Sequence, residues 1–311
     1  MLHFIVNPKS KSGKGKKIWK DLLPIVKKPS IQYDVYMTEA NHHATSLAAQ
    51  LCKDADDVAD AYVVTGGDGT LNEVVTGLLS GPVKQPLIGF IPTGSGNDFA
   101  RNMGIADDPA EALRDVLHAR QMKELDTGLI RCGSTERPFL VSAGIGYDAD
   151  VCDLIANSSS KTLFNKLHIG KLAYTWLGLK QAARYRKASG SITFDGGVTL
   201  TLKDIAFVSF HNVRTEGGGW PFAPDAVPDD GMLDICIVTT PSRLKFAAAL
   251  IASKLNGKHR NHAAVHIIKS RSAHLKIDKK LTVHTDGEIL GSFDELTVRC
   301  VPASVRLMTK G

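Results

Sequence analysis

Residues 61–75 read AYVVTGGDGTLNEVV, and this stretch decides how the first part of the chain folds. The apolar run 61–64 predicts a strand, and apolar residues at helical spacing over 71–79 predict a helix. Three glycines surround Asp68 between them, and such a turn is typical of a phosphate site at a helix N-terminus. The turn has no lysine, so Asp68 implies a cation such as Mg²⁺, unless it is only a turn residue. Thr70 and Glu73 predict a capping box that starts the helix after the turn.

The order of elements around this stretch predicts two domains, which suits a chain of 311 residues. Alternation of strands and helices over 1–125 indicates a parallel sheet with helices on both faces. The strands are expected at 2–6, 31–37, 61–64 and 87–91, and the helices at 14–27, 44–52, 71–79 and 109–120. From 126 onward, short strands predict an antiparallel sandwich or barrel, at 139–142, 190–194, 198–202, 205–210, 233–238, 274–277, 281–285 and 295–301. Two helices are expected among them, around 168–187 and 242–254.

Composition narrows the class of protein. Aromatic residues make up only 6%, which argues against a base-stacking surface for nucleic acid. The five cysteines form no CxxC pair, which fits a reducing cytosol and disfavours a zinc site. The N-terminus lacks a signal core, and the best apolar run, 246–252, is far shorter than a membrane span. We therefore expect a soluble cytoplasmic protein.

Two long windows of the second half contain no acidic residue. Window 154–194 has seven basic residues and window 235–277 has eight. Such segregation of charge favours binding to an anionic surface, either nucleic acid or acidic lipid. The alternative is that both windows are solvated faces that happen to lack acids.

Two further loops resemble the 66–70 turn in following a predicted strand. Loop 7–15, NPKSKSGKG, combines glycines with lysines, although it is not a Walker A loop. Loop 92–98, PTGSGND, supplies small donors and a second acid, Asp98. Because ligands bind at the carboxyl edge of a parallel sheet, three such loops together predict a nucleotide site.

Three motifs together resemble the diacylglycerol kinase catalytic family: Asn7-Pro8 with Gly13 and Gly15, GGDGTLNE at 66–73 and PTGSGNDFAR at 92–101. The bacterial soluble lipid kinases of this family fit best, and sphingosine kinases are relatives. AGIGYDADV at 143–151, GGGWPFAPDAVPDDGMLDICIV at 217–238 and TDGE at 285–288 extend the resemblance over nearly the whole chain. The resemblance implies a Rossmann-like α/β ATP-binding domain, 1–125, and an antiparallel β-sandwich domain for the lipid, 126–297. It also implies that about 298–311 returns to the first domain and that the site lies in the cleft between domains.

The resemblance also implies roles for individual residues. Asp286 matches the proposed general base with Glu288 beside it, and Asp68 with nearby Asp98 would organise Mg²⁺. A magnesium site is implied at Asp230 with the carbonyls of Val227 and Met232. ATP contacts are expected at Asn7, Ser10, Lys11, Ser12, Gly13, Lys14, Thr38, Gly66, Gly67, Asp68, Gly69, Thr70, Leu71, Asn72, Gly94, Ser95 and Asn97. Ser95 stands where the family usually has threonine, which keeps a hydroxyl for the phosphate.

Several alternatives stay open at this point. The residues alone favour a plain hairpin turn at Asp286-Gly287, and Asp229-Asp230 could likewise be turn residues. An NAD kinase shares the GGDG turn but gives the basic windows no role, and a non-catalytic binder of anionic surfaces is a third possibility. For a lipid kinase the windows imply peripheral attachment to an anionic membrane, and no nucleic acid is expected. The acceptor could be diacylglycerol, phosphatidylglycerol, a polyprenol or a sphingoid base, and a homodimer is possible.

Overall fold

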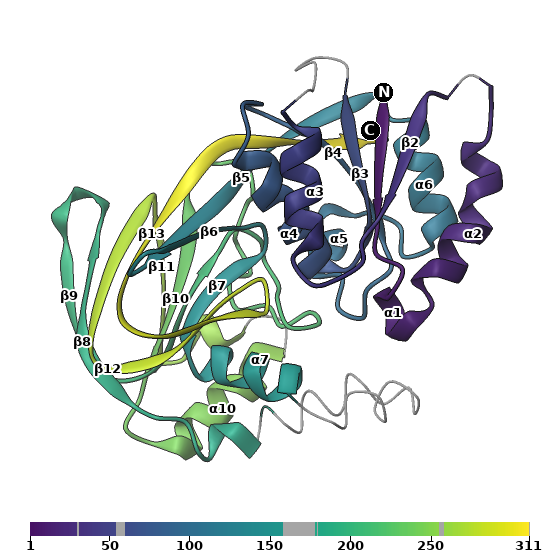
Figure 1. The fold of residues 1–311 in the computed structure, drawn as a ribbon. Coiled ribbons are helices and arrows are strands. Elements are labelled where there is room, and N and C mark those ends of the chain that lie inside the picture. The colour runs from purple at the N-terminus through teal and green to yellow at the C-terminus, as the bar shows by residue number, and fades with distance from the viewer. Residues whose placement is uncertain (30, 54–59, 158–177, 179, 255–257, 311) are drawn as a thin grey trace. The chain divides into compact units, whose positions relative to one another are not determined.

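The computed structural model describes residues 1–310 except 30, 54–59, 158–177, 179 and 255–257 (Figure 1). The chain divides into two compact units, of which the first contains Met1–Thr127 and Pro302–Gly311, and the second contains Gly128–Val301. The architecture is therefore an N-terminal α/β domain joined to a β-rich C-terminal domain.

The first unit is built on a parallel sheet. Its strand order is β13–β4–β3–β1–β2, and every neighbouring pair is parallel. Its elements are β1 (Leu2–Val6), α1 (Ser10–Gly13), α2 (Gly15–Val26), β2 (Tyr33–Met37), α3 (His43–Leu51), β3 (Ala61–Gly66), α4 (Asp68–Leu79), β4 (Leu87–Pro92), α5 (Asp98–Met103) and α6 (Pro109–Leu117). Strands β5 (Gln121–Cys132) and β13 (Glu288–Thr309) cross the boundary between the units.

Helices cover both faces of this sheet, α2 and α6 on one and α3 and α4 on the other (Figure 1). Strands β3 and β4 are buried along their whole length, as expected of central parallel strands with helices above and below. On the α2 side, Trp19 and Leu22 pack with Leu113 into the core. On the other side Gly77 lets α4 approach α3, because a Cβ there would lie 2.2 Å from the carbonyl oxygen of Thr45. These contacts pack α2 and α6 on one face of the sheet, and α4 against α3 on the other.

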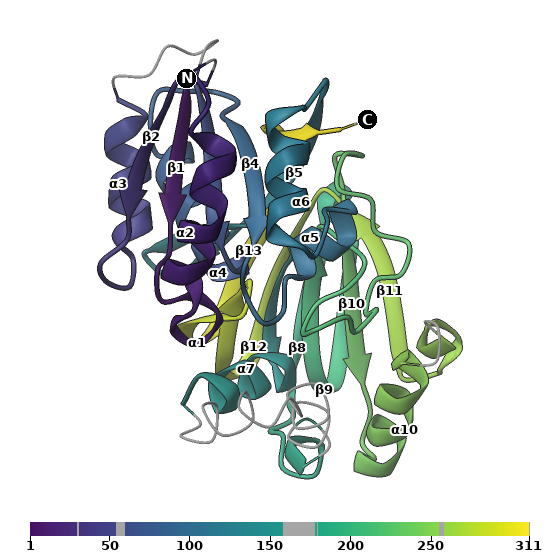
Figure 2. The same ribbon diagram turned by 90° about the vertical axis from the view of Figure 1, so that its right-hand side faces the viewer.

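The second unit is an antiparallel sheet in the order β11–β10–β9–β7–β12–β13. Strands β7 and β8 both lie between β9 and β12. Each of them pairs with β9 on one side and β12 on the other, and the two occupy different parts of the length of β9 and β12. Figure 2 shows α7 and α10 toward one end of this unit. Its elements are β6 (Thr135–Phe139), β7 (Ser142–Gly146), α7 (Tyr147–Asn157), β8 (Ala188–Phe194), η1 (Asp195–Gly197), β9 (Thr199–His211), β10 (Leu233–Thr239), α10 (Arg243–Lys254), η2 (Lys258–Asn261), β11 (Val265–Ser270) and β12 (Ser272–Thr285).

Some expected boundaries are wrong, and the reasons are local. The strands expected at 198–202 and 205–210 are one strand, β9, and those expected at 274–277 and 281–285 are one strand, β12. A residue with positive φ, Asp204, interrupts the first pair, and a register shift interrupts the second. Such bulges break the alternation of side chains without ending the strand.

Helix predictions also need one correction. Of the helix expected around 168–187, residues 178 and 180–182 are helical, so it ends earlier than expected, and its part up to 177 lies outside the described residues. The helix expected around 242–254 is α10. None of the helices in the described part of the chain has the length and apolarity that crossing a bilayer requires.

Candidate active site

Two glycine-rich turns cross at the carboxyl ends of β3 and β4. A Cβ atom on Gly94 would lie 2.6 Å from the Cα of Gly67, a separation that real side chains do not reach. Beside this crossing, the N–H of Thr93 donates to the carbonyl of Gly66 at 2.7 Å. The glycines therefore allow the two turns to lie backbone against backbone.

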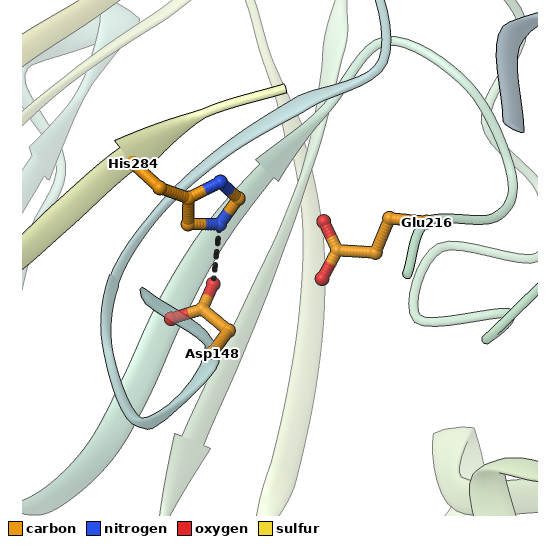
Figure 3. Close-up of side chains that lie close together, drawn as sticks. All are labelled: Asp148, Glu216 and His284. Carbon is orange, nitrogen blue, oxygen red and sulfur yellow. Dashed lines mark hydrogen bonds and ion pairs between the residues drawn. The ribbon is translucent and has the colours of Figure 1, made fainter. Parts of the chain in front are cut away.

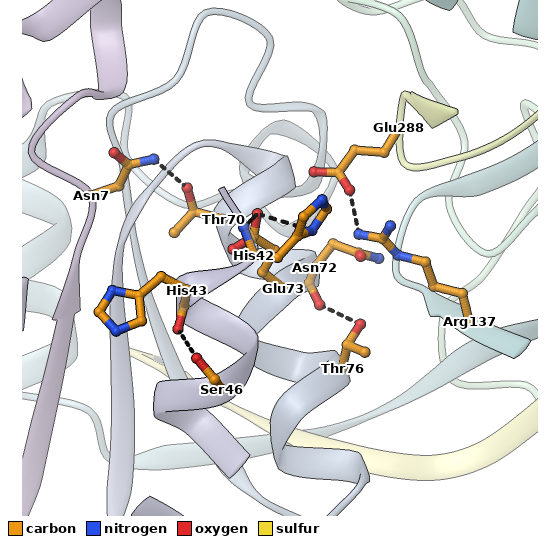
Figure 4. A network of polar contacts seen from close by, with 10 residues as sticks. All are labelled: Asn7, His42, His43, Ser46, Thr70, Asn72, Glu73, Thr76, Arg137 and Glu288. Atoms are coloured by element: carbon orange, nitrogen blue, oxygen red, sulfur yellow. Dashed lines mark hydrogen bonds and ion pairs between the residues drawn. The ribbon is translucent and has the colours of Figure 1, made fainter. Parts of the chain in front are cut away.

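The first loop is tied to the same place by side chains. Asn7 Nδ2 donates to Thr70 Oγ1 at 2.9 Å (Figure 4), and the hydroxyls of Ser10 and Thr93 lie 2.8 Å apart. All three loops expected at this sheet edge are thus joined by hydrogen bonds or close backbone contact.

This bonding corrects the expected capping box. Helix α4 begins at Asp68 with Gly67 as its N-cap and without a side-chain cap. The hydroxyl of Thr70 bonds Asn7, and Glu73 accepts the N–H of His42 at 3.1 Å (Figure 4). The first N–H groups of α4 have no partner within the helix, which is the usual arrangement at a phosphate-binding helix N-terminus.

Loop 7–15 has a strained backbone at its lysine-rich tip. Lys11, Ser12 and Gly13 have φ of 50°, 57° and 89°. Non-glycine residues in the left-handed region cost about 1 kcal/mol or more each, and such strain concentrates at ligand sites. Lys11 and Lys14 are exposed, whereas the Lys9 ammonium donates to the carbonyl of Glu39 at 3.0 Å. The tip therefore presents two lysines to solvent.

Asp68 has a structural task that the sequence did not reveal. Its two carboxylate oxygens accept the N–H groups of Asp98 and Phe99, at 3.0 and 3.1 Å, and so cap helix α5. Asp98 is itself ion-paired with Arg101, whose guanidinium also donates to the carbonyl of Gly96 at 2.8 Å. The two acids therefore form one network at the start of α5, and the cation that we expected beside them stays a prediction.

The other expected nucleotide residues lie around these turns. Thr38 follows β2 and is buried, and its N–H donates to the carbonyl of Val6 at 2.9 Å. Asn97 Oδ1 accepts the N–H of Gly94 at 3.0 Å, which closes the third loop on itself. Ser95 is exposed and Asn72 is buried in α4.

Asp286 occupies a hairpin turn and also fixes a second chain segment. Asp286 and Gly287 have φ of 46° and 84°, which forms the two-residue turn between β12 and β13. The carboxylate accepts three backbone N–H groups, those of Leu140, Val141 and Ser142, at 2.9, 2.8 and 3.0 Å. The turn interpretation is therefore correct, and the turn holds the carboxylate in one orientation.

Glu288 begins β13 directly after this turn. Its carboxylate is ion-paired with Arg137 of β6 (Figure 4), and both side chains are mostly buried. A mostly buried, charge-assisted pair of this kind anchors the start of β13 to β6.

A cluster that the sequence analysis did not single out lies close to the turn in the chain. His284 Nε2 donates to Asp148 at 3.3 Å, and Glu216 faces the pair (Figure 3). A Cβ atom on Gly144, which pairs with His284 across the strands, would lie 1.8 Å from the Asp148 carboxylate. The only signal in the sequence was the glycine and aspartate of AGIGYDADV. The space left by Gly144 is what lets the buried histidine and aspartate meet.

Charge determines the state of this cluster. Burial lowers the pKa of His284, but the hydrogen bond to Asp148 and the charges of Asp148, Glu216 and Asp286 outweigh it and raise the pKa above its usual value. The donor set Asp148, Glu216 and His284 lies within 4.8 Å and has the chemistry for a divalent cation. However, Nδ1 of His284 accepts the N–H of Gly287, so Nε2 carries the proton, which points at Asp148. A metal ion would need that nitrogen without its proton, so these residues fit a hydrogen-bonded pair better.

The expected magnesium site at Asp230 already has a cation of its own. Lys269 Nζ lies 2.7 Å from one oxygen of Asp230 and 3.6 Å from Asp234, and the N–H of Met232 donates to the other oxygen of Asp230 at 3.0 Å. The hydrogen bond with Asp230 raises the pKa of Lys269. The ammonium neutralises the carboxylate that a metal would use, so the residues present do not favour a metal ion there.

Residues 1–130 match the family described as the diacylglycerol kinase catalytic domain, and residues 141–309 match the YegS C-terminal NAD kinase beta sandwich-like domain. Over 309 residues the chain is 28% identical to YtlR of Bacillus subtilis, described as a candidate lipid kinase, and covers 98% of each chain. A diacylglycerol kinase of the same species is 29% identical over 258 residues, which are 81% of this chain and 80% of that one. A solved structure of a candidate diacylglycerol kinase from Bacillus anthracis aligns with a TM-score of 0.79 at 25% identity, covering 99% of this chain and 94% of that one.

Proposed function

Since the chain belongs to the diacylglycerol kinase catalytic family, we infer that it is a lipid kinase, which transfers the terminal phosphoryl group of ATP to a lipid hydroxyl. The acceptor that we propose is diacylglycerol, which would give phosphatidic acid, since a relative carries that name. Phosphatidylglycerol, a sphingoid base and a polyprenol carry similar hydroxyls and are the alternative acceptors.

One observation carries the nucleotide half of the proposal, namely that three glycine-containing loops are joined at one edge of a parallel sheet. We take this sheet as a Rossmann-like nucleotide fold. The N–H groups at the start of α4 and in loop 7–15 would hold the phosphates, and Lys11 and Lys14 would offset their charge. Phosphoryl transfer needs such positioning and charge neutralisation more than covalent catalysis.

The acids divide between two tasks in this proposal. Asp68 and Asp98 would hold Mg²⁺, which supplies charge neutralisation at the phosphates when bound. Asp286 would accept the proton of the lipid hydroxyl, and its fixed orientation supports that role, since a base must be held within hydrogen-bond reach of the proton. Glu288 would keep the turn in place through Arg137.

The basic windows support a further part of the proposal. An enzyme that acts on a membrane lipid must reach the bilayer, and basic residues near an anionic surface contribute on the order of 1 kcal/mol each. We propose peripheral attachment to an anionic membrane from the cytoplasm, with binding that weakens as salt screens the charges.

The proposal is tested by incubating the purified protein with labelled ATP, Mg²⁺ and detergent-dispersed acceptors. The acceptors are diacylglycerol, phosphatidylglycerol, a polyprenol, a sphingoid base and NAD, and each product is identified by its mass. We expect label in phosphatidic acid. Label in NAD alone would make the protein an NAD kinase, and no labelled product from any acceptor would support a non-catalytic binder.

A further inference from the structure

Helix α10 has two apolar faces, one of which is exposed. Phe246, Ala249 and Leu250 are buried and attach the helix to its unit. On another face, Leu244 is 84% exposed and Ile251 is 54% exposed. These two residues are seven positions apart, and the exposed Ala248 lies between them, so the three form one stripe along the helix.

This stripe differs from the scattered apolar residues that occur on any surface. A single exposed leucine is ordinary, but apolar residues aligned along one helix face are typical of a helix that lies on a membrane or a partner. The helix carries no acidic residue, and Arg243 and Lys245 flank Leu244 directly.

The tertiary structure adds basic residues from the other window to the same helix. The ring of Tyr185 packs on the ring of Phe246, with centroids 4.7 Å apart, and its hydroxyl donates to the carbonyl of Thr240 at 3.4 Å. The ammonium of Lys187 donates to the carbonyl of Pro241. The segment that precedes β8 therefore runs along the N-terminal half of α10.

This packing brings two exposed arginines, Arg184 and Arg186, to the helix, because they flank Tyr185 in the chain. In the part of the chain that the structure describes, neither these arginines nor Arg243 and Lys245 form an ion pair. By contrast, Lys187 is paired with Asp204 at 3.5 Å. Four cations, none with an acidic partner among the described residues, thus lie on α10 or in the segment that packs against it.

We propose that α10 is the element that enters the headgroup region of an anionic phospholipid bilayer. Leu244 and Ile251 insert among the lipids, and the four cations contact acidic headgroups. Charge complementarity selects this occupant, since an anionic bilayer offers both negative charge and an apolar layer beneath it. The inference rests on the proposed function, because a lipid acceptor is what requires the enzyme to meet a bilayer.

The test is sedimentation of the full-length protein with vesicles of equal parts phosphatidylglycerol and phosphatidylcholine. Burial of a leucine or isoleucine side chain contributes favourable free energy to membrane binding. The double variant Leu244→Ser with Ile251→Ser should therefore partition into the vesicles about 10- to 100-fold more weakly than the wild type. Arg243→Ala with Lys245→Ala should weaken it as well and reduce its dependence on salt. The matched control is Val198→Ser with Leu200→Ser, which changes two exposed apolar residues of the β8–β9 hairpin. It should bind like the wild type.

Three outcomes would overturn the inference. They are absence of wild-type binding to these vesicles, unchanged binding of the Leu244 and Ile251 double variant, or an equal loss in the control variant. If the Leu244 and Ile251 double variant keeps its binding to vesicles but loses binding to an acidic protein, α10 would instead be a protein-docking surface. Phosphorylation of a dispersed short-chain diacylglycerol is measured in parallel and should be equal in wild type and double variant. If wild type phosphorylates no acceptor, the proposed function fails, whatever the vesicles show.

Discussion

Replacement of Asp286 by asparagine separates the two tasks that the structure assigns to this residue. In the wild type, one carboxylate oxygen accepts the N–H groups of Val141 and Ser142, and the other accepts that of Leu140. An asparagine oriented with its oxygen toward Val141 and Ser142 keeps two of the three bonds. Its amide nitrogen then faces the N–H of Leu140, which is left without an acceptor.

The cost of this change can be worked out from those bonds. Leu140 is buried, so loss of one bond to a charged group and an unsatisfied N–H should lower the free energy of unfolding by about 2 to 4 kcal/mol. Asp286→Ala would remove all three bonds, at roughly 5 to 9 kcal/mol, which rivals the whole stability of a domain. Asparagine is therefore the informative variant, because the protein should stay folded.

If Asp286 is the general base, turnover of the asparagine variant should fall by about 10²- to 10⁴-fold, while affinity for ATP changes little. Urea unfolding gives the stability, labelled ATP with dispersed diacylglycerol gives the turnover, and ATP binding is measured by titration. The control is Asp126→Asn, since the buried Asp126 carboxylate accepts the N–H of Ala303 at 2.8 Å without an expected part in the reaction. A folded Asp286→Asn enzyme with turnover within a few-fold of the Asp126→Asn enzyme would refute the reasoning.

Three other changes test separate parts of the structure. Gly94→Ala puts a Cβ 2.6 Å from the Cα of Gly67, so the two turns must separate. The KM for ATP should then rise about tenfold or more in steady-state kinetics. An unchanged KM would show that the contact between the turns does not contribute to ATP binding. Burial, with the charges of nearby histidines, lowers the pKa of His211 to about 3, so folding keeps it neutral. The stability that neutral His211 contributes should be complete above pH 6.5 and should decrease by about 1.4 kcal/mol per pH unit between pH 6.5 and about pH 3 in urea titrations. A His211→Gln variant with the same slope would show that another group causes the decrease. Lys269→Met leaves the Asp230 carboxylate without its ammonium, so Mg²⁺ should raise the melting temperature of the variant. EDTA should leave the melting temperature of the wild type unchanged. A wild type that EDTA destabilises, with a variant that Mg²⁺ does not stabilise, would support a resident metal ion.

Local features were predictable from the sequence because they depend on neighbours in the chain. Helical spacing located α2, α3, α6 and α10 to within a few residues, since each buries one stripe against a sheet. The glycine turns after β3 and β4 were expected to lie together, and they do, because a parallel sheet brings the ends of its strands to one edge. The predicted capping box is wrong because Thr70 and Glu73 form hydrogen bonds with residues that are far away in the sequence.

Only the tertiary structure decided what the charged residues contact. Asp68 caps a helix that begins 30 residues later, Lys269 neutralises Asp230 from another strand, and neither pairing leaves a spacing that can be read in the chain. Two basic windows were visible as composition, but the packing of Tyr185 on Phe246 is what brings them to one helix. The sequence by itself determined most of the helices, the meeting of the glycine turns at one sheet edge and the family, because these depend on local pattern and motif. The partner of each buried or paired charge was decided by the fold, since long-range packing sets which groups lose water together.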